Sequence, residues 1–190
     1  LHTAYRRQRQ MCIRDRNMIA YKGFNKDLTC TKGKGVFQYE PGKKYVEEKA
    51  KCARTGFHAA TNPLDVLSYY NQKDDRYFLV EIEGDVDEDG RDTRISAQSI
   101  TLKRELTKEQ IYLLGVVWII EHPLADWPNI VEKDSGDANG EGSIIVRGKN
   151  PKAKGSIGDT LFLLMDDKDG NVSQAAVSYT HLRAHETLMN

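Results

Sequence analysis

The chain has 190 residues, of which 39% are hydrophobic and 29% charged, and its 28 basic and 28 acidic residues leave no formal net charge. This length fits one domain, or one domain with a small appendage. The even balance excludes a nucleic-acid-binding protein that depends on bulk positive charge, because phosphate neutralisation needs a surplus of cations. The longest apolar run, Ile111–Ile120, is shorter than a membrane span, which needs roughly 20 apolar residues. Three cysteines do not make a disulfide framework, which favours reduced thiols and a cytoplasmic location.

The two ends of the chain differ in composition from the rest. Residues 1–17 contain five Arg and one Asp and show no apolar periodicity. The strings Gln8–Arg16 and Val177–Thr187 resemble translated sequencing-adapter DNA joined to an unrelated reading frame. We therefore expect residues 1–17, as a disordered segment, and residues 177–190 to stand outside the fold. The alternative is a genuine basic arm, either a transit peptide or a nucleic-acid-binding segment.

The remaining segment, residues 18–176, is net acidic and opens with a β-rich region. Aromatic and β-branched residues between Gly and Pro punctuation predict three short strands, over Ile19–Phe24, Val36–Tyr39 and Lys44–Val46. Asn62 followed by Pro63 is typical of a helix start, since the Asn side chain caps the first turn and proline lacks only an N–H that would be unpaired there. A short helix is expected over Pro63–Tyr70.

The middle of the chain predicts further strands and one longer helix. Strands are expected over Arg76–Glu83, Arg94–Ala97 and Ser99–Leu106. Thr107 and Gln110 form a capping-box pattern, in which each side chain bonds the backbone N–H of the other residue. The helix that follows, to Glu121, is apolar nearly all round, which predicts burial deep in the core.

Polar, glycine-bearing sequence follows this helix. We expect a linker over residues 124–142 and a truncated β-hairpin appendage over residues 143–176. Within the appendage, the Lys-rich segment Arg147–Gly155 is expected to be a solvated loop. The predicted fold class is α+β: residues 18–123 form a small mixed or antiparallel sheet with two helices, and the hairpin appendage follows.

Several motifs occur in an order that points to a known family. They include Tyr-Lys-Gly-Phe at Tyr21–Phe24, Gly-Phe-His-Ala at Gly56–Ala59 and Asn-Pro-Leu-Asp-Val-Leu at Asn62–Leu67. In these motifs the chain, from Met18 to His122, resembles an uncharacterised domain family common in bacteriophage and prophage proteins. The resemblance implies no particular activity. It favours an accessory module that binds an unknown host or phage protein, in the host cytoplasm or on a virion, with no cofactor, nucleic acid or membrane partner.

His58 is the most chemically informative residue in these motifs. It stands shortly before the predicted helix start, where backbone N–H groups favour an anion. A histidine at such a place could contact phosphate or transfer protons. The alternative is a structural histidine that bonds loop backbone, and it is favoured because the sequence supplies no catalytic partner.

A weaker resemblance is to ADP-ribosyltransferase-like folds, which use NAD. The matching features are an early strand with Tyr-x-Gly, a later Gly-Phe-His strand and a short helix that ends in Tyr. This resemblance implies that the catalytic residues are His58, Tyr21 and Glu83. It also implies that the cofactor is held by Lys22, Gly23, Phe57 and Tyr70. Because Glu83 belongs to a Glu-x-Glu pair inside a predicted strand, a solvent-facing carboxylate explains it equally well.

Two acidic segments imitate calcium loops, and two cysteines raise the question of zinc. Asp85–Asp92 spaces its oxygens and glycine as a calcium loop does, but Ser96 stands where the bidentate Glu is required. Asp167–Asn171 departs from the pattern in a similar way. Cys30 and Cys52 have no second pair of cysteines to complete a zinc site. We expect solvated hairpin turns and separate thiols with no metal ligands, and a calcium- or metal-stabilised binding module is the third functional alternative.

Overall fold

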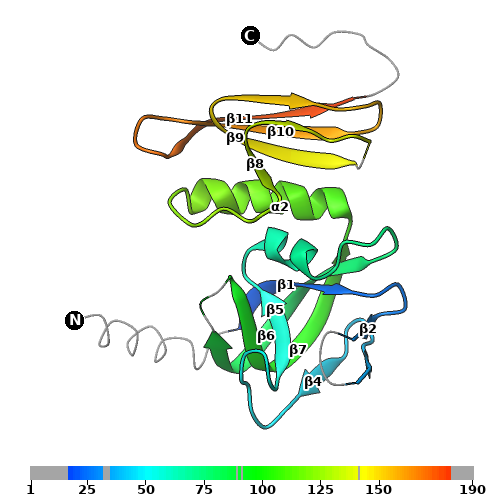
Figure 1. The fold of residues 1–190 in the computed structure, drawn as a ribbon. Helices are drawn as coiled ribbons and strands as arrows, with labels where there is room; N and C mark the ends of the chain where they lie inside the picture. Colours follow the sequence, from blue (N-terminus) through cyan, green and yellow to red (C-terminus); the bar gives the residue numbers. More distant parts are fainter. Residues whose placement is uncertain (1–16, 32–34, 89, 91, 141, 181–190) are drawn as a thin grey trace, which may run out of the picture. The chain divides into compact units, whose positions relative to one another are not determined.

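The computed structural model describes residues 17–31, 35–88, 90, 92–140 and 142–180, so the predictions for residues 1–16 and 181–190 lie outside the described part. The chain divides into two compact units, Leu1–Ile111 and Tyr112–Asn190, whose elements are labelled in Figure 1. Strands make up 51% of the residues and helices 13%, and the described part contains one helix of 7 or more residues. The predicted α+β class with two helices is therefore wrong, and the protein is mostly β.

Five strands of the first unit form one sheet in the order β4-β7-β5-β1-β6, and an additional pairing of β6 with β7 closes the ring β7-β5-β1-β6. Every neighbouring pair in this sheet is antiparallel. The strands are β1 (Met18–Phe24), β4 (Lys44–Val46), β5 (Phe57–Ala60), β6 (Arg76–Glu88) and β7 (Arg94–Leu106).

The long strand β7 makes this closure possible. One edge of β7 pairs with β5 through residues 94–97 and with β4 through residues 99–101, and its other edge pairs with β6. The two strands predicted for this region are thus one continuous strand. A register shift lies opposite it between Glu83 and Val86, where Gly84 adopts a φ of 80°. Such an irregularity increases local bending, which helps a short sheet to close.

Apolar side chains fill the inside of the ring. Because successive side chains on a strand point to opposite faces, every second residue of each strand enters the core. The core residues are Ala20, Phe24, Leu28, Tyr39, Phe57, Ala59, Phe78, Val80, Ile82, Ile95, Ala97, Ile100 and Leu102.

The first predicted helix is a single 3-10 segment, η1 (Pro63–Ser68). The expected cap is present: the N–H of Leu64 donates to Asn62 Oδ1 at 3.0 Å. A segment of 6 residues is too short to stabilise an α-helix by its own hydrogen bonds, and 3-10 geometry is common in such short turns. This shortening is one reason why the predicted two-helix fold does not form.

The second predicted helix, α2 (Lys108–Glu121), is present with its capping box. The N–H of Gln110 donates to Thr107 Oγ1 at 3.2 Å, and the N–H of Thr107 donates to Gln110 Oε1 at 3.0 Å. The predicted deep burial is wrong, because one face of α2 is exposed, at Leu113, Val117 and Ile120. Among the described helices, none combines the length and apolar character needed to span a membrane.

The second unit is built on a sheet of four strands in the order β11-β10-β9-β8. The strands are β8 (Val131–Asp137), β9 (Ser143–Lys154), β10 (Thr160–Asp166) and β11 (Val172–Tyr179). β8, β9 and β10 run parallel, and β11 runs antiparallel to β10. A strand therefore lies in the predicted linker, and β11 continues past residue 176, the predicted end of the appendage.

Strands β8, β9 and β10 follow one another without a crossover helix. The connections 138–142 and 155–159 are shorter than the usual crossover between parallel strands, so the chain winds in successive coils. Asp159 fastens one connection to the other, since its carboxylate accepts the N–H groups of Gly140 and Gly142 at 3.1 and 3.0 Å. The N–H of Ser156 is a third donor and contributes most to lowering the Asp159 pKa.

Candidate functional site

Lys22 is a charged residue in the core of the first unit. It lies on β1 between Ala20 and Phe24, both core residues, and so its side chain belongs to the inward-facing side of the strand. Only 5% of Lys22 is exposed. Its Nζ donates to the carbonyl oxygen of His58 at 2.6 Å, which is a neutral partner rather than a carboxylate. A buried ammonium held by a carbonyl is unusual, because burial penalises the charged form.

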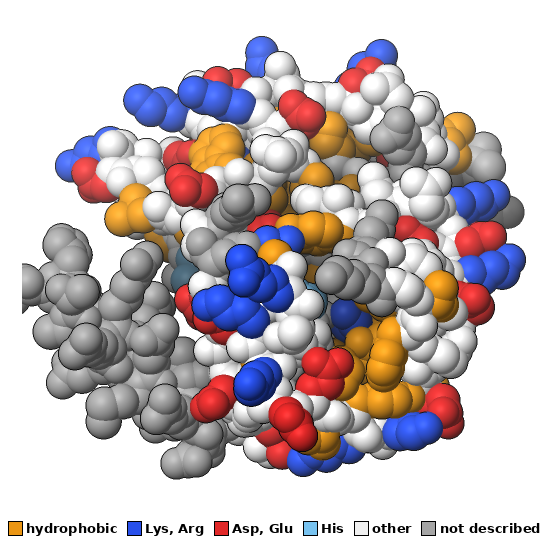
Figure 2. Space-filling model, turned by 60° about the horizontal axis from the view of Figure 1, so that its bottom comes forward, with side chains coloured by type: hydrophobic (Ala, Val, Ile, Leu, Met, Phe, Trp, Pro, Cys, Tyr) orange, Lys and Arg blue, Asp and Glu red, His pale blue; other side chains and the backbone are white. Residues whose placement is uncertain are grey.

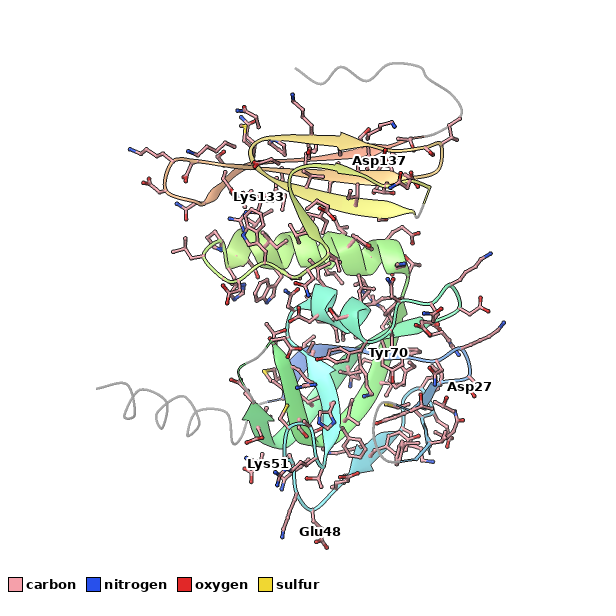
Figure 3. All side chains as sticks on the ribbon, in the orientation of Figure 1. Asp27, Glu48, Lys51, Tyr70, Lys133 and Asp137 are labelled. Carbon is pink, nitrogen blue, oxygen red and sulfur yellow. The ribbon has the colours of Figure 1, made fainter. Side chains whose placement is uncertain are left out.

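Two aromatic rings lie beside the Lys22 ammonium, and a thiol contacts a nearby tyrosine. Nζ lies 5.5 Å from the ring centroid of Phe24 and 5.4 Å from that of Tyr39. The Tyr70 hydroxyl, from the end of η1, donates to Cys30 Sγ at 3.1 Å, and Tyr70 is labelled in Figure 3. A negative charge on Cys30 would raise the pKa values of Lys22, Tyr39 and Tyr70. We call Lys22, Cys30, Tyr39, His58 and Tyr70 the lysine cluster.

Burial dominates the acid–base chemistry of the lysine cluster. Desolvation lowers the pKa of Lys22, and the negative charge of a Cys30 thiolate opposes that shift. Desolvation also raises the pKa values of Tyr39 and Tyr70 above the ordinary phenol value, so that both hydroxyls stay protonated. The cluster therefore offers an amine driven toward its neutral form, a thiol and two hydroxyl donors.

A tight turn places Cys30 in the lysine cluster. Asp27 Oδ1 accepts the N–H and the hydroxyl of Thr29 at 3.1 and 2.6 Å, and these bonds lower the Asp27 pKa. The turn leads into β2 (Thr29–Cys30), which pairs with β3 (Phe37–Gln38) so that Cys30 stands opposite Phe37. Neither Cys30 nor Tyr39 is among the site residues predicted from the sequence, because this pairing across a Gly-rich loop leaves no motif.

Gly23 allows Tyr70 to reach Cys30. A Cβ atom on Gly23 would stand 2.7 Å from both Cβ and Cδ2 of Tyr70. We expect Gly23→Ala to lower the free energy of unfolding of the first unit by ~1–3 kcal/mol, the usual cost of an overpacked core. Urea unfolding followed by far-UV circular dichroism measures this effect. In a Tyr70→Gly background the substitution should cost less, because the Cβ and the ring carbons are both gone, and an equal cost in both backgrounds contradicts the steric explanation.

The ring and the backbone of His58 have different partners. Its carbonyl accepts the Lys22 ammonium, whereas its Nε2 accepts the N–H of Ala53 at 2.9 Å. A ring that bonds loop backbone is what the structural alternative predicts. The neighbouring start of η1 is closed by the Asn62 cap and by Asp65, whose Oδ2 accepts the Thr93 N–H and hydroxyl at 2.9 and 2.7 Å. A carboxylate at this position disfavours a bound anion.

The structure brings some of the other predicted residues together and separates the rest. Gly23 and Phe57 lie beside the lysine cluster, since Gly23 contacts Tyr70 and the Phe57 ring centroid is 6.3 Å from that of Tyr39. The Tyr21 side chain points to the face of β1 opposite that of Lys22. The backbone of Tyr21 pairs with Ala60 of β5 and Leu79 of β6. Glu83 is in an ion pair with Lys44, with 2.6 Å between Oε2 and Nζ. The predicted catalytic trio is therefore not assembled around one point.

The two calcium-like segments form other contacts. Asp87 lies inside β6, where Oδ2 accepts the N–H of Cys52 at 2.8 Å and Oδ1 is 3.3 Å from Lys51 Nζ. Asp167 Oδ1 accepts the N–H groups of Asp169 and Asn171 at 2.8 and 2.9 Å, which closes a hairpin turn. Within the described ranges, no group of three or more His, Cys, Asp or Glu side chains is arranged to hold a metal ion.

Comparisons with known proteins identify the family of the first unit. Searches of curated proteins and of solved structures returned no match. A family model described as domain of unknown function DUF7666 matches residues 18–114. The match starts at Met18, where the resemblance to an uncharacterised family also starts, and it takes in every strand of the closed sheet and every member of the lysine cluster. The chain therefore belongs to the DUF7666 family.

Proposed function

We propose that this chain is an accessory module of a bacteriophage or prophage that binds a protein partner through an apolar surface of its first unit. The observation that carries the proposal is the exposure of three apolar side chains at and beside β3 and β4. Val36, Phe37 and Val46 are 71%, 40% and 69% exposed. We call these three exposed residues the apolar patch: Val36 and Phe37 are neighbours on the chain, and Val46 follows Tyr45, whose ring centroid lies 5.5 Å from that of Phe37. All three residues lie within residues 18–114, the region that the DUF7666 family model matches.

Aromatic rings pack against Phe37 of the apolar patch. The Phe37 ring centroid lies 4.7 Å from that of Tyr39, 5.5 Å from Tyr45 and 5.9 Å from Phe57. Aromatic rings in such edge-to-face contacts have few alternative positions, so little side-chain freedom is lost when a partner binds. Figure 2 shows several groups of hydrophobic side chains on the face that it brings forward, with charged side chains between them. An apolar centre with a polar rim is typical of protein interfaces.

The end of the sheet adds a second means of recognition. β4 is the last strand of the order β4-β7-β5-β1-β6, and among the described strands it pairs only with β7. Its other edge presents backbone N–H and C=O groups, to which an extended peptide can add as a further strand. Val46 belongs to this strand, so one partner segment can contact both the Val46 side chain and the backbone of β4.

The positions of His58 and Glu83 favour binding over NAD chemistry. An ADP-ribosyltransferase needs a carboxylate at the reacting ribose, and Glu83 is engaged by Lys44. The His58 ring is engaged by the backbone of Ala53. The nearly complete burial of Lys22 also keeps its amine from a large cofactor. Phage origin rests on the family resemblance of the motifs Tyr21–Phe24 and Gly56–Ala59, and the expected site of action is the host cytoplasm or a virion.

Photo-crosslinking in the bacterial host tests the apolar patch. A photoreactive phenylalanine at position 37 is expected to crosslink to one protein, and Val46→Ser should weaken that binding at least ~10-fold, as loss of a central interface residue does. The matched control places the same probe at Ile19, an exposed apolar residue of β1 outside the patch. A second probe at Val117 tests the exposed face of α2. Equal crosslinking from positions 19 and 37 would contradict the assignment of the interface.

The enzymatic alternative is tested directly with NAD. The full chain is expected to release no nicotinamide beyond the rate of the His58→Ala variant. Release that depends on His58, in a variant whose unfolding transition is unchanged, would replace the binding function with a catalytic one.

A further inference from the structure

The exposed face of α2 carries three apolar side chains in a row. Leu113, Val117 and Ile120 are 46%, 45% and 43% exposed. Residues spaced by four and three positions lie on the same side of a helix, so these side chains form one line along α2. We call these three residues the helix stripe. It belongs to the second unit and shares no residue with the apolar patch.

The other sides of α2 are already packed. Ile111, Val116 and Ile119 are buried, and the Tyr112 ring stacks on that of Phe162 in β10 with 6.2 Å between the ring centroids. A helix that is apolar all round is typical of an element buried on every side. In a single chain the face that carries the helix stripe does not meet this expectation. The stripe is therefore a surface that a further element can cover.

We propose that the helix stripe binds the helix stripe of a second copy of this chain, with the two α2 helices antiparallel. Spacing by four and three fits a helix with the same spacing, because side chains so arranged interlock between two helices. In the described part of the chain α2 is the one helix of 7 or more residues, so a second α2 is the element that the protein itself supplies. Pairing of one surface with itself about a two-fold axis is also the commonest arrangement of identical chains.

The charges of α2 favour the antiparallel arrangement. Glu109 lies in the first turn and Glu121 at the last position, both are exposed, and the last turn contains no basic residue. Parallel helices would place each glutamate beside its own copy, where like charges repel. Antiparallel helices place Glu121 of one copy beside the uncharged Leu113 of the other. They also bring the negative C-terminal end of each helix dipole to the positive N-terminal end of its neighbour.

The middle residue of the stripe, Val117, lies closest to the two-fold axis in this arrangement. Leu113 of one copy is then nearest to Ile120 of the other, and valine, the smallest of the three side chains, lets the helices approach each other. Because three partly exposed side chains make up the stripe, the contact is smaller than the ~800 Å² per partner of a stable interface. We therefore expect a weak dimer that forms at micromolar or higher concentration.

Analytical ultracentrifugation of the full chain, from micromolar to millimolar concentration, tests the proposal. The parent chain is expected to form a concentration-dependent dimer. Val117→Glu should abolish the dimer, because two carboxylates would meet at the axis, and should leave the unfolding transition unchanged, because this residue is exposed in the single chain. Ile157→Glu is the matched control and should keep the dimer, since Ile157 is an exposed apolar residue between β9 and β10 of the same unit.

Two further measurements identify the partner and the orientation. A mixture of Val117→Glu and Val117→Lys should dimerise again, because opposite charges then meet at the axis. In a chain whose three cysteines are replaced by alanine, Val117→Cys should form a disulfide-linked dimer and Leu113→Cys should not. An antiparallel pair holds the two copies of residue 113 beyond the Cα separation of ~4.4–6.8 Å that a disulfide needs. Equal disulfide formation from both positions contradicts the antiparallel orientation.

The proposal is overturned if the parent chain stays monomeric over the whole concentration range, or if Val117→Glu dimerises as strongly as the parent. Crosslinking of the photoreactive probe at Val117 to a different protein, with no link to a second copy, would likewise assign the helix stripe to another partner. Because the helix stripe and the apolar patch share no residue, this proposal and the proposed binding function can fail independently.

Discussion

Replacement of Arg147 by alanine is expected to lower the free energy of unfolding of the second unit by ~3–5 kcal/mol, the usual cost of breaking a buried ion pair. Arg147 is 2% exposed. Its Nε donates to Asp166 Oδ1 at 2.8 Å, and one terminal nitrogen donates to the oxygens of Pro123 and Gly170, each at 2.9 Å. The alanine variant leaves Asp166, itself largely buried, without its counter-charge.

A second contact adds to the loss in the Arg147 variant. The guanidinium lies 4.7 Å from the centroid of the Trp127 ring, where an arginine gains cation–π attraction and packing. Lysine cannot reproduce both the stack and the planar set of donors, so Arg147→Lys should recover only part of the stability.

Tryptophan fluorescence during urea unfolding measures this effect selectively. The chain has two tryptophans, Trp118 and Trp127, and both belong to the second unit. Lys149→Ala is the matched control, because Lys149 is an exposed cation on the same strand, β9. If Arg147→Ala shifts the unfolding transition no further than Lys149→Ala does, the ion pair between Arg147 and Asp166 does not stabilise this unit.

Arg147 also shows where sequence-based prediction fails. The segment Arg147–Gly155 has the composition of a solvated basic loop, yet its first residue is buried and the segment is largely strand. Its partners, Pro123, Asp166 and Gly170, come from distant points of the chain. No local pattern marks an arginine whose counter-charge and carbonyls are supplied by the winding of the fold.

Local features of the first unit were predictable because they depend on neighbouring residues. Alternation in β1 and β6, the Asn62 cap and the Thr107–Gln110 capping box all involve groups within a few residues of one another. Closure of the sheet was not predictable, since it depends on β6 pairing with both β1 and β7. The coiled course of β8 to β10 was not predictable either, because it depends on pairing between strands and no sequence repeat marks the paired positions.

One sign of the lysine cluster was present in the sequence. Residues 20, 22 and 24 occupy one face of a predicted strand, and the pattern Ala-Lys-Phe places a charge between two apolar residues. A lysine at a core-facing position is rare unless it is paired, so the alternation itself marks Lys22 as unusual. Its partners Cys30 and Tyr39 remained hidden, because they arrive through the β2–β3 hairpin.

Replacement of Lys22 by methionine is expected to stabilise the first unit, and the gain should depend on pH. Methionine has about the same length and brings no charge into the core. Replacing a buried charged group by an apolar residue of similar size is often stabilising, so a gain on the order of 1–3 kcal/mol at neutral pH is expected. The gain is partly offset because the His58 carbonyl loses its donor.

The direction of the pH dependence follows from the lowered Lys22 pKa. Between the folded-state value and the ordinary value of 10.5, the unfolded chain holds a proton that the folded chain has released. Rising pH therefore stabilises the folded parent protein through this group, and the methionine variant lacks the effect. The difference in stability should be largest at and below the folded-state pKa and shrink as the pH approaches 10.5.

Urea unfolding followed by far-UV circular dichroism, at a series of pH values from neutral upward, measures this difference. Lys26→Met is the matched control, because the Lys26 side chain is 77% exposed and pairs only at the surface with Asp74. Its effect should be small and should not follow the same pH profile. If the stability difference between Lys22→Met and the parent is the same at every pH, Lys22 keeps its ordinary affinity for protons in the folded state. The amine would then be charged in the core.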